Sequence, residues 1–252
     1  MELRQIEKGD YKLILQLDAK VYPVSEENKI KPETIDKWYN TYPKYGMIYT
    51  NNNNIIAMAI AIPMPMNIWY KLIKGECFEN TLNIQWEQSN NDKNGNKVNI
   101  NIGIHIYHIE VLYRDIVGKG FYKHMLQDLN SISKNYHHNI EGLSGYCVTP
   151  KGNRLFIDIL KCKNAEDFRN SNDKNYNKNE NNKKEMSEFI VQDNINGEIK
   201  IVECSCDTDI KQPYFENNIH PPKSYKFISK CNMLYTIRKE PNDSPVWEYL
   251  KT

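Results

Sequence analysis

An alternating run of isoleucines whose phase changes once constrains the fold of this chain most. Apolar side chains occupy every even position from Val98 to Ile106, whereas the next two, Ile109 and Val111, occupy odd positions. Successive side chains of a strand point to opposite faces, so a strand that keeps one buried face needs an extra residue where the phase changes. The pattern predicts a β-bulge near Tyr107–His108. The alternative is a strand buried on both faces beyond Ile106.

Periodicity and breaker residues place the other elements around this strand. We expect helices that start at Asp10, Pro32, Phe121 and Pro150, a hairpin whose turn is Asn51–Asn54, and strands over Glu2–Glu7, Ile140–Val148, Glu188–Gln192, Gly197–Cys204 and Cys231–Arg238. This order predicts an α/β (α+β) fold, with a mixed sheet covered on both faces by helices. It is not the even alternation of a dinucleotide-binding fold.

Charge and hydropathy exclude several classes of protein. The chain has 33 basic and 32 acidic residues, without the basic surplus that a nucleic-acid binder needs to displace counterions. The best apolar run, Ile55–Ile68, is broken by Pro63 and Pro65 and is too short for a membrane span. Met1–Asp10 is charged and lacks the apolar region of a leader. We expect a soluble, cytoplasmic protein with neither nucleic-acid nor membrane partners.

Cysteine usage and composition bear on the domain organisation. The six cysteines are scattered, which in an intracellular chain indicates reduced thiols. Cys204 and Cys206, at period two, are interpreted as core-facing strand residues, so no metal site is predicted. Asn164–Glu185 is dominated by Asn, Lys, Asp and Glu, which is typical of a disordered insertion. We therefore expect one domain over residues 1–252, interrupted by this insertion.

A glycine-bearing loop follows the alternating strand and precedes a helix. Gly118 and Gly120 can adopt backbone angles that turn successive N–H groups toward one point. The helix that starts there adds its own unpaired N–H groups and the positive end of its dipole. The loop is therefore a candidate site for a phosphate or pyrophosphate.

This loop resembles motif A of the GNAT superfamily of acetyl-CoA-dependent N-acetyltransferases, Arg/Gln-x-x-Gly-x-Gly/Ala between the fourth strand and the third helix. Met125 and Leu126 match the paired apolar helix positions of that family, which places Val117 at the Arg/Gln position and Tyr122 at the last Gly/Ala position. Both are departures from the pattern. The resemblance implies acetyl-CoA as co-substrate, bound by Val111, Leu112, Val117, Gly118, Lys119, Gly120, Phe121 and Tyr122.

The resemblance also makes the fold more specific. It implies a mostly antiparallel sheet whose bulged fourth strand splays from the fifth, with acetyl-CoA between the two. Cys147–Asn153 is similar to the end of the fifth strand and the start of the next helix. That helix commonly carries a tyrosine that protonates the leaving thiolate. Arg154–Phe168 contains no tyrosine, and Phe156 is the nearest match.

Acetyl transfer needs a base, because an amine acceptor is mostly protonated at neutral pH. Candidates on the splayed strand are His108, whose ordinary pKa suits a base, and Glu110, whose pKa burial would raise. Tyr146 on the next strand lies close to a position that some family members use for a base. His105 and Tyr107 belong to the same strand. Each of these residues could instead be structural.

We expect an N-acetyltransferase that acylates a primary amine, with a small molecule such as an amino-sugar phosphate preferred as acceptor. The first alternative is a protein N-terminal or lysine acetyltransferase. The second is a non-catalytic module that binds CoA or a partner on the same fold, which the missing tyrosine and the departures at Val117 and Tyr122 favour. The oligomeric state stays open, and a homodimer is one option.

Overall fold

The computed structural model describes residues 1–21, 29–86, 98–165, 186–193, 199–205, 225–230, 232–238 and 244–250. The strands are β1 (Glu2–Gln5), β2 (Gly46–Asn51), β3 (Asn54–Pro65), β4 (Ile100–Val111), β5 (His138–Cys147), β6 (Lys163–Asn164), β7 (Met186–Asp193), β8 (Ile199–Ser205), β9 (Tyr225–Lys230) and β10 (Asn232–Ile237). The α-helices are α1 (Tyr11–Val21), α2 (Pro32–Tyr39), α3 (Met66–Lys74), α4 (Arg114–Val117), α5 (Phe121–Asn135), α6 (Pro150–Asn153) and α8 (Val246–Tyr249). Short 3-10 turns are η1 (Lys8–Asp10), η2 (Pro43–Tyr45) and η3 (Glu79–Thr81), and η4 (Arg154–Ile159) is a π-helix.

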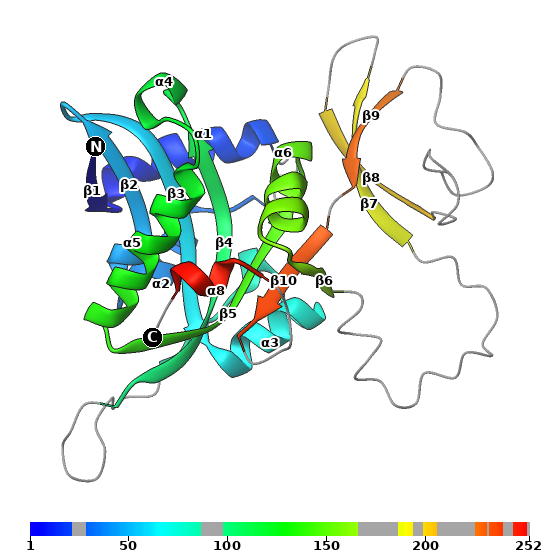
Figure 1. The fold of residues 1–252 in the computed structure, drawn as a ribbon. Helices are drawn as coiled ribbons and strands as arrows, with labels where there is room; N and C mark the ends of the chain where they lie inside the picture. Colours follow the sequence, from blue (N-terminus) through cyan, green and yellow to red (C-terminus); the bar gives the residue numbers. More distant parts are fainter. Residues whose placement is uncertain are drawn as a thin grey trace.

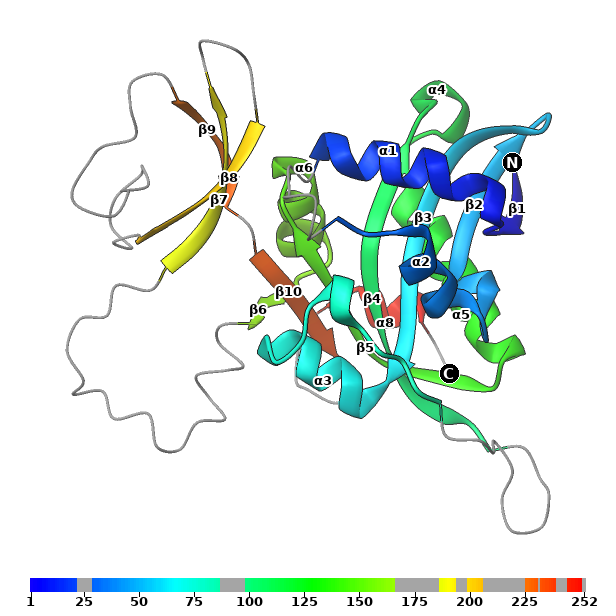
Figure 2. The same ribbon diagram turned by 180° about the vertical axis from the view of Figure 1, so that it is seen from behind.

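Seven strands form one mixed sheet in the order β1-β2-β3-β4-β5-β10-β6. Every pairing in it is antiparallel except that of β4 with β5, which is parallel. A parallel pair needs a crossover connection, and α5 supplies it. In Figure 1, α5 and α8 lie in front of the sheet, and Figure 2 shows α1, α2 and α3 over the opposite face. The predicted fold class is confirmed.

Buried side chains hold the helices to both faces of the sheet. The apolar side chains on one face of α5 are all buried, namely Phe121, Met125, Leu126, Leu129 and Ile132. On the other face, Trp69 of α3 lies so close to the sheet that a Cβ on Gly103 would be 2.1 Å from its ring, and one on Gly142 would be 2.7 Å away. These two glycines let the indole approach the backbone of β4 and β5.

The strand β3 contains two prolines, Pro63 and Pro65, near its end. Its pairing with β2 stops at Gly46↔Ile60, so the two prolines lie where β3 has only β4 beside it. A strand tolerates proline where that residue's missing N–H would not have served the ladder. The predicted hairpin turn is confirmed, with positive φ angles at Asn52 and Asn53.

Three further strands form a separate sheet in the order β8-β7-β9. The predicted strands Glu188–Gln192 and Gly197–Cys204 correspond to β7 and β8, which pair antiparallel. The third strand, β9, has no counterpart in the sequence prediction. Of the late strands, β10 joins the large sheet beside β5. The predicted insertion lies outside the described residues from 166 to 185, and Asn164 itself belongs to β6 and pairs with Leu234 of β10.

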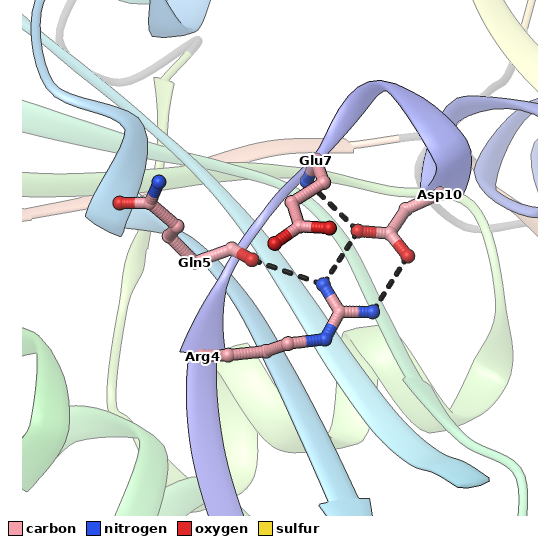
Figure 3. A network of polar contacts seen from close by, with 4 residues as sticks. All are labelled: Arg4, Gln5, Glu7 and Asp10. Carbon is pink, nitrogen blue, oxygen red and sulfur yellow. Dashed lines mark hydrogen bonds and ion pairs between the residues drawn. The ribbon is translucent and has the colours of Figure 1, made fainter. Parts of the chain in front are cut away.

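An ion pair joins the first strand to the start of α1, as Figure 3 shows. Arg4 donates to both carboxylate oxygens of buried Asp10 at 2.7 Å, and the Glu7 N–H donates to Asp10 at 2.8 Å. Burial opposes ionisation of Asp10, but the hydrogen bonds from Arg4 and Glu7 outweigh it and leave its pKa below the ordinary value. This contact joins β1 to η1, the turn from which α1 continues.

Candidate active site

The site begins at a β-bulge in β4. The register with β3 runs Ile60↔His108 and then Ala61↔Ile106, so Tyr107 is the extra residue. The bulge predicted from the phase change is confirmed. It is also the point where β4 leaves β5, because their pairing ends at Ile106↔Gly145. Beyond that pair, β5 is paired with β10 and β4 continues only with β3.

From His108 onward, β4 diverges from β5, and we call this part of the strand the diverging arm. Its backbone N–H groups point alternately toward its two edges. Leu112 donates its N–H to the Ile56 carbonyl at 2.9 Å, so this N–H does not serve the predicted binding of acetyl-CoA. Alternate residues of an antiparallel strand direct their N–H groups to opposite edges. The Val111 N–H therefore points toward the edge that β5 has left. Of the two residues, Val111 has the N–H direction that the prediction requires, and its role in binding stays a prediction.

The glycine loop follows this arm after the short helix α4. Gly118 ends α4 with φ 77° and donates its N–H to Arg114 at 2.8 Å, so this N–H does not serve the predicted phosphate site. Val117 likewise donates to Tyr113 at 3.1 Å. Gly120 is the N-cap of α5 with φ 81°, as the motif predicted. Only the later part of the loop offers its backbone N–H groups.

The loop nevertheless fits a pyrophosphate. A Cβ placed on Gly118 or on Gly120 would meet no atom within 4 Å, so the backbone can be approached closely there. Lys119 is exposed, Phe121 is buried and anchors the helix start against Tyr49 with ring centroids 4.9 Å apart, and Tyr122 is partly buried. Residues 119–122 at the start of α5 would hold the phosphates, through N–H groups and the helix dipole.

The register places the three predicted catalytic residues on one face of the sheet, the face that α1, α2 and α3 cover. His108 and Glu110 pair with Ile60 and Met58, at even positions of β3, as His105 pairs with Ile62. His105 in turn pairs with Ser144, two residues before Tyr146 on β5. His108 and Glu110 therefore belong to the arm that diverges, and Tyr146 to the strand from which it diverges.

Glu110 is not desolvated as predicted. About 35% of its side chain is exposed, and its Oε2 lies 3.8 Å from Nε2 of His108. The apolar neighbours Ile109 and Val111 point to the other face of the sheet, because they pair with odd positions of β3. Burial therefore does not prepare this carboxylate to act as a base.

His108 is buried, in contrast to Glu110. Burial lowers its pKa to about 4, so the ring is neutral at neutral pH. A base works best when its pKa lies near the operating pH. His108 is thus a better hydrogen-bond partner for a substrate than a proton acceptor.

A cluster that the sequence did not reveal surrounds the bulge. Asp18 of α1 is hydrogen-bonded to Tyr107, and the ring of Trp38 in α2 lies 5.1 Å from that of Tyr107. With His108 these residues form what we call the bulge cluster: Asp18, Trp38, Tyr107 and His108. Each is less than 9% exposed. In the sequence, nothing distinguishes Asp18 from a polar residue on the exposed face of a helix. The fold places it beside β4, where it is hydrogen-bonded to Tyr107.

A chain of buried hydrogen bonds lies beside the bulge cluster. Glu79 Oε1 is 2.6 Å from His105 Nε2, and His105 Nδ1 is 2.9 Å from Ser144 Oγ. Trp69 Nε1 donates to the same hydroxyl at 2.9 Å. The carboxylate accepts from Nε2–H, so Ser144 donates to Nδ1 and accepts from Trp69, and every group is satisfied. His105, a residue of the splayed strand, is therefore structural.

The position of the expected acid is apolar. Phe156 is buried, and a Cβ on Gly145 would lie 2.6 Å from its ring, so the ring touches the residue where the β4–β5 pairing ends. Phe156 belongs to η4, and π-helical turns occur frequently at functional sites.

Cys147 and Cys162 are buried nearby, and burial raises the pKa of both thiols. His138 is also buried, and its Nδ1 lies 2.9 Å from the Tyr45 hydroxyl.

The described residues contain neither a cluster of metal-ligating side chains nor a helix suited to span a membrane. Within them, no group of three or more His, Cys, Asp or Glu side chains is arranged to hold a metal ion. In the same part of the chain, no helix has both the length and the apolar character needed to cross a membrane.

Comparison with known proteins gives likenesses to solved structures. No protein-family model matches the chain, and no curated protein matches it. The solved structures include the Drosophila melanogaster polyamine N-acetyltransferase, with TM-score 0.42 and 10% identity over 94% of this chain and 99% of that one. An agmatine N-acetyltransferase variant matches with TM-score 0.40 and 9% identity over 94% and 98%. Ard1 from Thermoplasma volcanium matches with TM-score 0.35 and 9% identity over 95% and 98%.

Two of these three are N-acetyltransferases. Their TM-scores lie below 0.5 and their identities near 10%.

Proposed function

We propose that this protein is an N-acetyltransferase of the GNAT superfamily that transfers the acetyl group of acetyl-CoA to a primary amine. One observation carries the proposal: the Tyr107 bulge parts β4 from β5, and the diverging arm leads directly into the glycine loop at the start of α5. An extended, pyrophosphate-bearing thioester needs both features, a strand edge with unpaired N–H groups and a helix N-terminus.

Residues 119–122 would hold the pyrophosphate, and the Val111 N–H would hydrogen-bond the extended chain or the thioester carbonyl. When bound, acetyl-CoA supplies an activated acetyl group with a thiolate leaving group. The chain itself positions the acceptor on the face covered by α1 and α2, where the bulge cluster lies. A preorganised donor at the carbonyl is worth several kcal/mol in such reactions.

The acceptor is proposed to be a small primary amine. The charged groups at the site are carboxylates, namely Asp18, Glu79 and Glu110, which attract an ammonium group and repel a phosphate. An amine without a phosphate near its reacting nitrogen therefore suits the site better than an amino-sugar phosphate. A protein N-terminus or lysine remains the alternative acceptor.

A non-catalytic CoA-binding module is the second candidate, and Phe156 is the observation that favours it. Its ring occupies the place of the usual acid and cannot protonate a thiolate. A CoA thiolate is, however, a good leaving group that water can protonate after it departs, so the absence of a tyrosine does not preclude turnover.

Binding is tested first, by thermal shift with acetyl-CoA. A ligand at 100 times its dissociation constant adds about 2.7 kcal/mol to stability, which raises the melting temperature by several degrees. Turnover is tested next, by release of the CoA thiol and by mass spectrometry of the acceptor. The panel contains phenethylamine, 1,4-diaminobutane, glucosamine 6-phosphate and a short peptide with a free N-terminus. Binding without acetylation of any amine supports the non-catalytic module, and no binding refutes both.

A further inference from the structure

Three residues that contact or adjoin Tyr107 each have a buried polar atom without a hydrogen-bond partner. The atoms are Asp18 Oδ1, Trp38 Nε1 and His108 Nε2, as judged among the described residues. Asp18 is hydrogen-bonded to Tyr107 through its carboxylate, the Trp38 ring packs on Tyr107, and His108 follows it in the chain with ring centroids 6.5 Å apart. Buried polar groups are almost always satisfied, so three unsatisfied groups at one bulge indicate a place built for a ligand.

The chemistry of these atoms indicates which ligand. Asp18 Oδ1 can only accept while the carboxylate is ionised, and His108 Nε2 can accept in a neutral ring that carries its proton on Nδ1. The indole N–H of Trp38 can only donate. An alkylammonium offers three N–H donors, two of which Asp18 and His108 can accept. The rings of Trp38 and Tyr107 add aromatic walls, which also favour a cation.

We propose that the bulge cluster is the acceptor site and that Asp18 binds the alkylammonium group and takes its proton. This inference rests on the proposed acetyl transfer and names its acceptor class and its base, in place of Glu110. In a substrate that carries a hydrogen-bond acceptor atom, Trp38 Nε1 donates to that atom. The site selects a primary alkylamine that enters with its nitrogen first.

The step balances without a further reagent. Asp18 removes one proton from the ammonium, which leaves a neutral amine with its lone pair free. The nitrogen–carbon bond forms at the thioester carbonyl as the carbon–sulfur bond breaks, and the sulfur leaves with the bonding electrons. The second nitrogen proton neutralises that thiolate, and Asp18 returns its proton to water. The products are the N-acetylated amine, the free thiol and one proton.

The environment of Asp18 suits this role. Burial, and secondarily the charge of Glu79 on η3, raise its pKa to about 6, while the hydrogen bond with Tyr107 opposes them. The strand β4 also presents His105, His108 and Glu110 on this face, and α2 presents Trp38, which does not titrate. A base with this pKa is ionised at neutral pH and still basic enough to accept a proton.

The decisive variant is Asp18→Asn, which keeps the size of the side chain and removes its basic oxygen. With each panel amine that the wild type acetylates, kcat/KM should fall about 10²–10⁴-fold, the range for a lost general base. The thermal shift with acetyl-CoA should not change. Asp36→Asn is the matched control, because Asp36 lies in α2 with about 42% of its side chain exposed and bonds Tyr11 and Lys8.

An amine substrate of low basicity distinguishes a role of Asp18 in proton transfer from a role in positioning the substrate. β,β-Difluorophenethylamine reaches the site largely uncharged, so it has little need of a base. The loss caused by Asp18→Asn should be at least about tenfold smaller for this amine than for phenethylamine. Equal losses for the two amines would overturn Asp18 as the proton acceptor.

Tyr107→Phe provides a second test that does not depend on Asp18→Asn folding. Removing the hydroxyl removes the hydrogen bond that lowers the pKa of Asp18. The acid limb of the kcat/KM–pH profile should therefore move to higher pH, whereas a merely structural tyrosine would lower the rate equally at every pH.

If the wild type acetylates an amine but Asp18→Asn keeps more than a third of the rate, this inference fails alone. If the wild type acetylates none, the proposed function fails with it.

Discussion

His105 Nε2 lies 2.6 Å from Glu79 Oε1, and this contact fastens the segment after α3 to the middle of the seven-stranded sheet. His105 is fully buried and Glu79 is 18% exposed in its side chain, so the pair joins the core to its edge. Ser144 and Trp69 continue the same chain of hydrogen bonds across β5 and α3. The network joins η3, α3 and β5 to β4, the strand that also carries Tyr107 and His108.

Glu79→Ala should therefore destabilise the protein. It leaves His105 Nε2 buried without an acceptor, which costs about 1–3 kcal/mol. Urea denaturation measures this loss. Glu76→Ala is the control, because Glu76 is half exposed and its nitrogen–oxygen distance to Lys74 is 3.9 Å. Exposed pairs of this kind contribute about 0–1 kcal/mol, so comparable losses in the two variants would contradict the role given to His105.

Gly120→Ala should weaken acetyl-CoA binding by about tenfold. The residue has φ 81°, and a non-glycine residue in this region costs about 1–2 kcal/mol, although the added Cβ meets nothing within 4 Å. The helix start would shift to relieve the strain and move the N–H groups of residues 119–122. Gly9→Ala is the control, since it also has open space but no positive φ. Isothermal titration should show weakened binding for Gly120→Ala alone.

The stability of Asp18→Asn relative to the wild type should rise with pH. The pKa of Asp18 is raised from 3.8 to about 6 in the folded protein by burial, so the folded state binds the proton more tightly than the unfolded state. Wild-type stability therefore falls as pH increases through about 4 to 6, and the asparagine variant escapes this fall. The difference amounts to about 2–3 kcal/mol above pH 6.

Asp36→Asn should show the opposite trend in the same denaturation series. Hydrogen bonds from Tyr11 and Lys8 lower the pKa of Asp36, so its contribution is present above the unfolded pKa and is lost in acid. The buried His108 and His138 also titrate in acid, since burial lowers the pKa of each to about 4. They are common to all the variants and cancel in the differences. A parallel response of Asp18→Asn and Asp36→Asn would show that Asp18 is not held in a desolvated site.

Replacement of residues 166–185 by a short Gly-Ser linker should leave the melting temperature within a few degrees. The stretch contains few apolar side chains that could offset the entropy of ordering it. The replacement must start after Ala165, because Asn164 pairs with β10 and Ala165 is buried. Loss of folding on replacement would show that the stretch packs against the domain.

The sequence predicted features that depend on local pattern. The phase change after Ile106 locates the bulge, because the period of a strand is two and an extra residue must appear somewhere. The spacing of Met125 and Leu126 fixes the register of the glycine loop, and Gly120 does begin α5. These are properties that a few neighbouring residues decide.

Features that depend on contacts between distant residues could not be predicted. Asp18 meets Tyr107 only because α1 crosses β4, and nothing in α1 alone distinguishes it from a surface aspartate. The pairing of Glu79 with His105 crosses a segment without clear periodicity. The burial of Glu110 was predicted from its apolar neighbours Ile109 and Val111, but neighbours in a strand point to the opposite face.

The central claim, acetyl transfer to a primary amine, is tested most directly by CoA thiol release in the presence of phenethylamine and 1,4-diaminobutane, with mass spectrometry of the amine. The account predicts amine-dependent release in the wild type, a matching N-acetylated product, and a rate that falls at least about 100-fold in Asp18→Asn but not in Asp36→Asn. Thiol release that no amine increases, in a wild-type protein that binds acetyl-CoA, would contradict it.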